Sequence, residues 1–258
     1  MSELIEKLKR VDEAGPISLG FGSSNNSGKS AKMLIIGSVT IKEIKEMTSI
    51  KKFPVDAYLI SSNGDEHKQL SKINKLKSLV WGLKLEGTLF NTGLKELVNA
   101  GMDFVAFTAN DTPVDFLIDH EIGKILVLNN DIDENSSRGI EGLGIDAVIL
   151  PKPSKMNHIM VNHLMDIHSN RSLVSTFALI ETSIILTNNE LVSLRDIGIE
   201  AILVDLKTVG YEGIRTMRDS IDRLPKRKTK AGTRDGLLTA AGFRVSRNEE
   251  EQEEEEED

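Results

Sequence analysis

Short apolar runs alternate with amphipathic stretches along most of the chain. Residues 79–87 show the pattern clearly: an apolar run ends in Lys84, Leu85 and Glu86 and then breaks at Gly87. Apolar runs of this length indicate buried strands, and apolar residues spaced three and four apart indicate helices. The pattern predicts eight strands, each followed by a helix, at residues 33–39, 55–61, 79–85, 104–108, 124–129, 147–150, 173–180 and 201–206.

Capping residues predict where several helices begin. Thr40 and Glu43 have the spacing of a capping box, and so do Thr187 and Glu190. An early proline after a capping residue, in 111–113, predicts another helix start. The remaining helices are predicted near residues 66–77, 94–100, 137–143, 156–169 and 211–224, and a first helix at 2–14 precedes the strands.

An internal repeat marks every second strand. An acidic residue stands just before an apolar run, and in three of four cases a glycine precedes it by two residues; the acids are Asp56, Asp103, Asp146 and Glu200. Alternate strands of a closed barrel contribute to the same interior layers, so a mark on alternate strands is typical of closure. The predicted fold class is therefore α/β, a (βα)8 barrel, and an open sheet with helices on both faces is the alternative.

The chain divides into four segments by composition. A helix and a polar loop packed on the barrel are predicted for 1–32, the barrel for 33–224, a basic connector with a short docking segment for 225–248, and a disordered acidic tail for 249–258. The net charge of −8 resides in this tail, where nine of the ten residues are acidic. The rest of the chain is close to neutral.

Composition removes several classes of protein. The absence of cysteine excludes disulfides, thiolate ligands and a cysteine nucleophile, and favours the cytoplasm. One tryptophan and two tyrosines argue against a stacking platform for single-stranded nucleic acid. No run reaches the roughly 18 apolar residues of a membrane span, and residues 2–8 are helical in pattern instead of resembling a leader. We expect a small-molecule ligand, no nucleic-acid or membrane partner, and a chain compatible with a homo-oligomer.

Lys84 is the first candidate for chemistry. Strict alternation in 79–86 separates the bulky residues 79, 81, 83 and 85 from the inward set 80, 82, 84 and 86. On the even-numbered strands the alanines 57, 106, 147 and 201 are predicted to line the barrel, and Tyr58, Phe107, Leu150 and Val204 to face the helices. An inward lysine can form a Schiff base with a carbonyl or anchor an anion. An interior salt bridge to Glu86, Asp205 or Glu181 is the alternative.

Other polar residues follow the predicted strands. Glu86 and Asp205 are the candidate proton-transfer groups, which completes the catalytic set with Lys84. Four further residues are predicted to bind substrate at the mouth of the barrel: Thr108, Asn110, Glu181 and Lys207. For the predicted strands 124–129 and 173–180, the sequence leaves open which side chains face the barrel interior and which face the helices. The acids at the strand entrances receive no catalytic role, because they lie at the opposite end of the barrel.

Several motifs are incomplete. Residues 28–30 match the end of a phosphate-binding P-loop, but Ser23 stands where its first glycine belongs. His158, His163 and His168 are five residues apart, which scatters them around a helix instead of aligning them on a metal. No metal site is predicted, and the sequence identifies no cofactor.

The repeated strand entrances, such as Gly144-Ile145-Asp146-Ala147-Val148, resemble those of (βα)8 TIM-barrel proteins in general. The resemblance covers residues 33–224 and points to no single family. It implies an active site at the C-terminal ends of the strands. Many such barrels bind phosphate with glycine-rich loops after strands seven and eight; here those strands lead into 181–184 and 207–210, so phosphate is not expected to bind in that way.

Three functions are compatible with these features. The first is a TIM-barrel enzyme of lyase or isomerase type, acting on a small carbonyl- or carboxylate-bearing metabolite through Lys84. The alternative is a non-catalytic barrel that serves as a binding or assembly module. A flavin-dependent oxidoreductase is a weaker third hypothesis. The fold alone does not choose among them.

Overall fold

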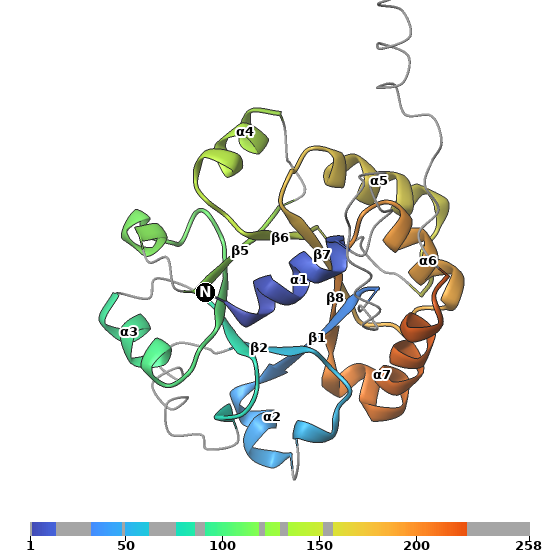
Figure 1. Ribbon diagram of the computed structural model, residues 1–258, viewed down its shortest axis with the longest axis horizontal. Helices are drawn as coiled ribbons and strands as arrows, with labels where there is room; N and C mark the ends of the chain where they lie inside the picture. Colours follow the sequence, from blue (N-terminus) through green and yellow to red (C-terminus); the bar gives the residue numbers. More distant parts are fainter. Residues whose placement is uncertain are drawn as a thin grey trace, which may run out of the picture. The chain divides into compact units, whose positions relative to one another are not determined.

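Eight parallel strands close into a barrel in the computed structural model of the chain (Figure 1). The structure describes residues 2–13, 32–47, 50–61, 76–85, 91–118, 122–129, 134–151 and 157–225. Each strand pairs with its sequence neighbours, and β8 pairs with β1, so the open-sheet alternative is excluded. The strands are β1 (Leu34–Thr40), β2 (Ala57–Ser61), β3 (Trp81–Lys84), β4 (Phe104–Phe107), β5 (Gly123–Val127), β6 (Ala147–Leu150), β7 (Phe177–Thr182) and β8 (Ala201–Asp205).

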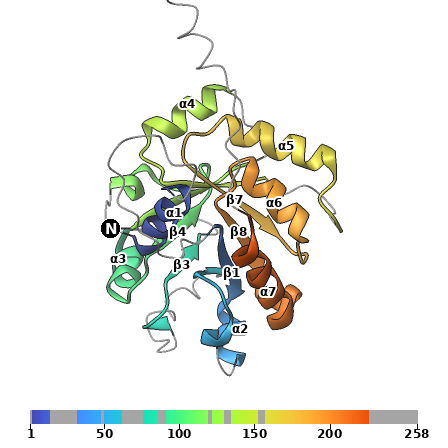
Figure 2. The same ribbon diagram turned by 45° about the vertical axis from the view of Figure 1, so that its right-hand side comes forward.

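The helices between the strands surround the barrel (Figures 1 and 2). They are α2 (Ile41–Glu46), α3 (Asn91–Asn99), α4 (Glu134–Gly142), α5 (Val161–Ser172), α6 (Asn188–Asp196) and α7 (Leu206–Arg223), with the 3₁₀ helices η1 (Ile50–Lys52) and η4 (Val114–Ile118). Both predicted capping boxes are confirmed, at Thr40 with Glu43 and at Thr187 with Glu190. None of the described helices is long and apolar enough to span a membrane.

Two predicted boundaries are wrong, and one predicted helix is preceded by a further helical turn. Leu173 caps the C-terminus of α5, so the predicted strand 173–180 begins later, at Phe177. The start predicted at Pro113 leads into η4, which is a single 3₁₀ segment. α7 begins at Leu206, but Gly210, whose φ of 70° is left-handed, divides it, and the part after this break agrees with the helix predicted at 211–224. Most of the helix predicted at 66–77 lies outside the described residues.

Two separate apolar clusters show which way the strand residues face. The inner cluster fills the barrel and includes the four alanines 57, 106, 147 and 201, as predicted. The outer cluster lies between strands and helices and contains Tyr58, Phe107, Leu150 and Val204, also as predicted. On β3, Trp81 and Leu83 are in the outer cluster, which confirms the alternation proposed for that strand.

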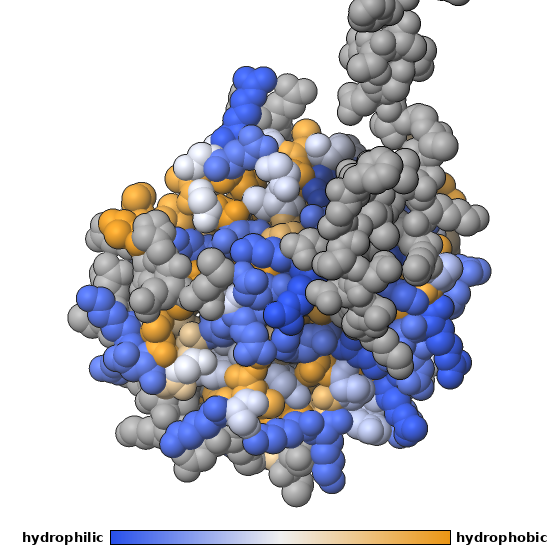
Figure 3. Space-filling view, in the orientation of Figure 1, coloured by the Kyte–Doolittle hydropathy of each residue, from blue (hydrophilic) through white to orange (hydrophobic). Residues whose placement is uncertain are grey.

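A helix that precedes the barrel covers the N-terminal ends of the strands. α1 (Glu3–Glu13) lies over the centre of the barrel in Figure 1, and its residues Leu4, Ile5 and Leu8 belong to the inner cluster. The Asp103 carboxylate, at the start of β4, accepts hydrogen bonds from the Ser2 hydroxyl at 2.8 Å and from the backbone N–H groups of residues 3 and 4 at 2.6 and 2.9 Å. Hydrophilic side chains gather over the same place in Figure 3. An acidic residue of the barrel therefore caps α1 from outside the helix.

The other three entrance acids bind the preceding strand. Asp56 accepts the N–H of residue 35 on β1 at 2.8 Å, Asp146 accepts that of Lys124 on β5 at 2.8 Å, and Glu200 accepts that of residue 178 on β7 at 2.7 Å. In these three cases the acid accepts the N–H of the second residue of an odd strand and so ties that strand to the even strand that follows. Burial raises the pKa of Glu200 and outweighs the opposing hydrogen bond from residue 178 and the charge of Arg171.

Candidate active site

Interior side chains of alternate strands share layers across the barrel. Thr40 of β1 pairs with Ser61 of β2, and following such register partners through all eight strands leads back to β1 at position 32. This position is eight residues before Thr40. Residues at the same height along the barrel axis are therefore displaced by one residue in the register from each strand to the next. The highest apolar layer consists of Leu59, Ala106, Ile149 and Leu203, all at most 4% exposed. The next layer toward the C-terminal ends consists of Ser38, Lys84, Val127 and Glu181. A further layer above it consists of Ser61, Thr108, Pro151 and Asp205.

Lys84 and Glu181 are the charged members of one layer. They come from β3 and β7, which are four strands apart and so lie opposite each other in the barrel. Both side chains are half-buried. Among the described residues, the Lys84 ammonium and the Glu181 carboxylate make no hydrogen bond or ion pair. The structure therefore places a cation and an anion on opposite walls, directly above a closed apolar floor.

Asp205 faces the mouth as predicted, but its carboxylate is engaged locally. It accepts the backbone N–H of Lys207 at 3.1 Å and the hydroxyl of Thr208, and so caps the N-terminus of α7. Lys207 is wrongly placed by strict alternation. The strand ends at Asp205, Lys207 lies in the first turn of α7 with its side chain 75% exposed, and its ammonium lies 3.6 Å from Glu43 of α2.

The remaining predicted site residues differ in how they are held. The Thr108 hydroxyl donates a hydrogen bond of 2.8 Å to Asp111, which holds the turn after β4. Asn110 is exposed in that same turn. Glu86 lies outside the described residues. The structure thus brings Lys84, Glu181, Thr108 and Asp205 to one end of the barrel, where Lys207 is exposed in the first turn of α7 and does not face the interior.

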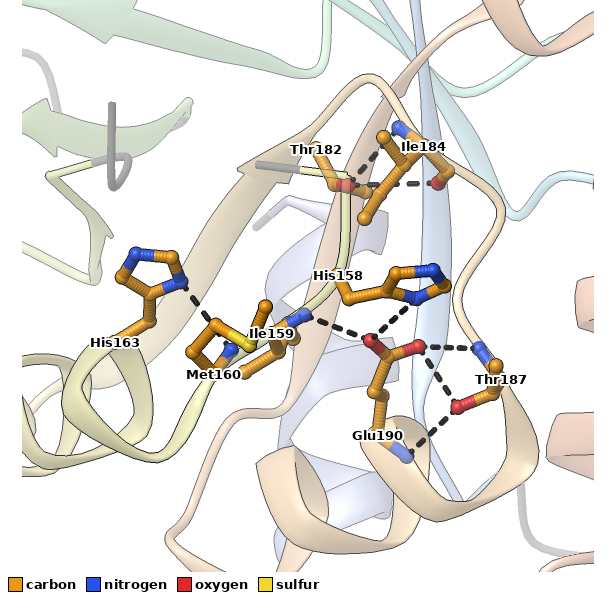
Figure 4. Close-up of polar contacts among 8 residues, drawn as sticks. All are labelled: His158, Ile159, Met160, His163, Thr182, Ile184, Thr187 and Glu190. Atoms are coloured by element: carbon orange, nitrogen blue, oxygen red, sulfur yellow. Dashed lines mark hydrogen bonds and ion pairs between the residues drawn. The ribbon is translucent and has the colours of Figure 1, made fainter. Parts of the chain in front are cut away.

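A second polar cluster lies at the rim, where α5 and α6 begin (Figure 4). Glu190 accepts hydrogen bonds from the backbone N–H groups of Ile159 and Thr187, both at 2.7 Å, and its carboxylate lies 3.7 Å from His158 Nδ1. Partial burial acts to raise the pKa of Glu190, but the hydrogen bonds from Thr187 and Ile159 and the charge of His158 outweigh it and lower that pKa. Glu190 therefore ties the approach to α5 onto the start of α6.

A shallow groove of about 200 Å³ lies beside this cluster. Its apolar side is formed by Ile159, Met160, Val161 and Leu164 at the start of α5, and its other side by the α6 residues 189, 190 and 193. Met160 and Val161 are 57% and 77% exposed. Sequence reasoning missed this groove, although the apolar pair at 160–161 in a polar surrounding is a visible sign of it.

Sequence reasoning also missed Ser38, and it named Glu181 only as one of three possible salt-bridge partners of Lys84. Ser38 follows Leu34 and Ile36 at a spacing of two, so the alternation within β1 could have placed it inside the barrel. The pairing of Lys84 with Glu181 depends on the register between strands, which no local pattern carries.

Comparison with known proteins supports the fold and goes no further. No protein-family model matches the chain, and no curated protein matches it. Solved structures do match. KGPDC from Streptococcus mutans superposes with a TM-score of 0.57 at 11% identity, over 74% of this chain and 98% of that chain, and a ligand complex of the same protein gives a TM-score of 0.56. This chain is a TIM barrel.

A second solved protein agrees. A mutant tryptophan synthase alpha-subunit from Pyrococcus furiosus superposes on this TIM barrel with a TM-score of 0.50 at 10% identity, over 74% of this chain and 97% of that chain. At such identities the likeness concerns the fold alone. It identifies the C-terminal ends of the strands as the place where TIM barrels carry their active sites, which is the end at which Lys84 and Glu181 lie.

Proposed function

We propose that this TIM barrel is an enzyme of lyase or isomerase type that acts on a small carbonyl- or carboxylate-bearing metabolite through Lys84. The observation that carries the proposal is the interior position of Lys84, half-buried at the C-terminal end of β3 and without an ion pair among the described residues. A lysine held only to balance charge inside a barrel would be paired with a carboxylate. Lys84 has no such partner among the described residues.

Two further observations support a site for a small polar molecule. The hydroxyl group of Ser38 comes from the layer of Lys84, those of Ser61 and Thr108 come from the layer above it, and all three can donate to or accept from a substrate. The similar solved structures add a lesser support, since one is a subunit of tryptophan synthase and KGPDC has also been solved in complex with a ligand.

The anion site that many TIM barrels form after strands seven and eight is disfavoured by Asp205. Its carboxylate occupies the N-terminus of α7, where a phosphate would need the free N–H groups. A phosphate there would also meet the negative charge of Asp205 at close range. This argues against a flavin whose phosphate binds at the site after strands seven and eight.

Trapping with borohydride tests the proposal with simple carbonyl compounds in place of the natural substrate. The protein is incubated with pyruvate or dihydroxyacetone and sodium borohydride, and the adduct is located by peptide mass mapping. We expect one adduct on Lys84, which is absent in Lys84→Met. The matched control is Lys207→Met, an exposed lysine of the same end, which should keep the adduct on Lys84. An adduct pattern unchanged in Lys84→Met would refute the role of this lysine.

A binding or assembly module is the second candidate, and the exposed groove beside α5 is the observation that favours it. Native mass spectrometry of gently purified protein separates the two functions. A retained small molecule supports the enzyme. An empty barrel in a defined oligomer, together with no trapping by either carbonyl compound, supports the module.

A further inference from the structure

The carboxylate best placed to work with Lys84 is that of Glu181. The two residues share one interior layer on opposite strands, with only the short side chains of Ser38 and Val127 completing that layer. The floor beneath them is apolar and at most 4% exposed, so a molecule that entered from the mouth would rest between the amine and the carboxylate.

Three other described carboxylates at this end already accept hydrogen bonds. Asp205 accepts hydrogen bonds from Lys207 and Thr208 as the cap of α7. Glu190 is held by two backbone N–H groups at the rim. Glu43 belongs to the capping box of α2 and lies near the exposed Lys207. Of the two described carboxylates in the interior layers at this end, Glu181 and Asp205, Glu181 is the one with no hydrogen bond to give up before it can accept a proton.

We propose that Glu181 is the acid–base residue that moves a proton at the carbon next to the substrate carbonyl, a role that rests on the proposed function of Lys84. The Lys84 amine adds to the carbonyl carbon, water leaves, and a protonated imine forms. The Glu181 carboxylate then removes one proton from the adjacent carbon. The electron pair of that C–H bond forms the C=C bond of an enamine, and the C=N pair returns to nitrogen. Returning the proton to carbon reverses the step.

This chemistry defines a substrate class. The substrate is an aldehyde or ketone with at least one hydrogen on the carbon beside the carbonyl, because Glu181 needs a proton to remove. A hydroxyl or carboxylate elsewhere on the molecule would meet Ser38, Ser61 and Thr108. The cap formed by Asp205 selects against a phosphate on the side of β8.

The exchange of carbon-bound protons with solvent measures proton removal by Glu181 separately from imine formation by Lys84. Pyruvate is incubated with the protein in D2O, and the loss of its methyl signal is followed by proton NMR, with dihydroxyacetone as the second probe. Borohydride trapping on the same samples reports imine formation separately. The variants are Glu181→Gln, which keeps the shape and removes the base, and Glu181→Asp, which keeps a carboxylate but withdraws it. Fluorescence of Trp81, which is 1% exposed, verifies the fold of each variant.

We expect Glu181→Gln to form the trapped adduct while its exchange rate falls on the order of 100-fold or more, and Glu181→Asp to recover part of that rate. Trapping with an unchanged exchange rate in Glu181→Gln would overturn the assignment of Glu181 and leave the role of Lys84 intact. A folded Glu181→Gln that no longer forms the adduct would also overturn it, since Glu181 would then act in imine formation. If Glu181→Gln does not fold, Glu181→Asp decides by the same two readouts. Absence of an adduct on Lys84 in the unmodified protein refutes the proposed function itself.

Discussion

Replacing Asp103 with alanine removes the acceptor of three hydrogen bonds that hold the start of α1 on the barrel. The bonds from the Ser2 hydroxyl and the Leu4 N–H are partly buried, while the one from Glu3 is exposed and can be replaced by water. Loss of a helix cap costs about 0.5 to 2 kcal/mol, and hydrogen bonds to a charged group contribute about 1.5 to 3 kcal/mol each when buried. We expect the free energy of unfolding to fall by about 2 to 3 kcal/mol.

Urea denaturation measures this loss. Trp81 is the only tryptophan, is buried, and accepts at its carbonyl the backbone N–H of Asp103, so its fluorescence reports on this part of the barrel. Asp146→Ala is the matched control, because Asp146 holds the equivalent position on β6 and accepts the Lys124 N–H without contacting α1. Its loss should be smaller, about 1.5 kcal/mol, which is the lower end of the range for one hydrogen bond to a charged group.

A double-mutant cycle then tests whether α1 is the cause. Ser2→Ala should destabilise the unmodified protein and have much less effect when Asp103 is already alanine, because the hydroxyl then has no carboxylate to bind. The reasoning fails if Asp103→Ala is no more destabilising than Asp146→Ala, or if the effects of Ser2→Ala and Asp103→Ala simply add.

Two further predictions concern packing and pH. Gly82→Ala should lower the melting temperature strongly, because the added Cβ would lie 2.4 Å from the backbone oxygen of Phe104. Gly139→Ala in α4 adds a Cβ that meets nothing within 4 Å, so it should stabilise the protein by about 0.5 to 1 kcal/mol. Equal melting temperatures of the two variants would contradict both expectations. The folded protein lowers the pKa of Glu190 below the ordinary pKa of its carboxyl group. The stability that Glu190 confers is therefore present above that ordinary pKa and is lost as the pH falls through the lowered pKa. The difference in unfolding free energy between the unmodified protein and Glu190→Gln should shrink on acidification, and a difference that grows would show the opposite sign.

Local patterns in the sequence predict the fold and the position of Lys84 because both depend on short-range periodicity. The strand around Trp81 is regular, and Trp81 and Leu83 pack against the helices, so the alternation of side chains correctly predicts that Lys84 lies on the interior side of this strand. The glycines that end helices before the entrance acids adopt a left-handed φ, at Gly101, Gly144 and Gly198, as a helix terminus requires. These features are set by residues within one turn or one strand.

The errors arise where an element ends. Leu173 and Val174 are apolar and precede a strand, but they finish α5, so the strand prediction began too early and left the phase of Glu181 open. At β8, the carboxylate of Asp205 starts a helix at the next residue, and alternation applied beyond that point misplaced Lys207. Both errors lie where the chain changes between the period of a helix and the period of a strand. Helix capping fixes the residue at which this change occurs, and a rule of strict alternation takes no account of capping.

The helix over the N-terminal ends of the strands has a consequence for the order of folding. Its binding surface combines residues from β1 to β8, among them Leu34, Asp103 and Ala201, so it is complete only when the sheet has closed. Residues 2–13 leave the ribosome before any of these strands, although the surface that they dock on forms only when all of the strands are in place. A segment synthesised ahead of the barrel is thus expected to fold after it, and contacts of such long sequence separation are formed slowly.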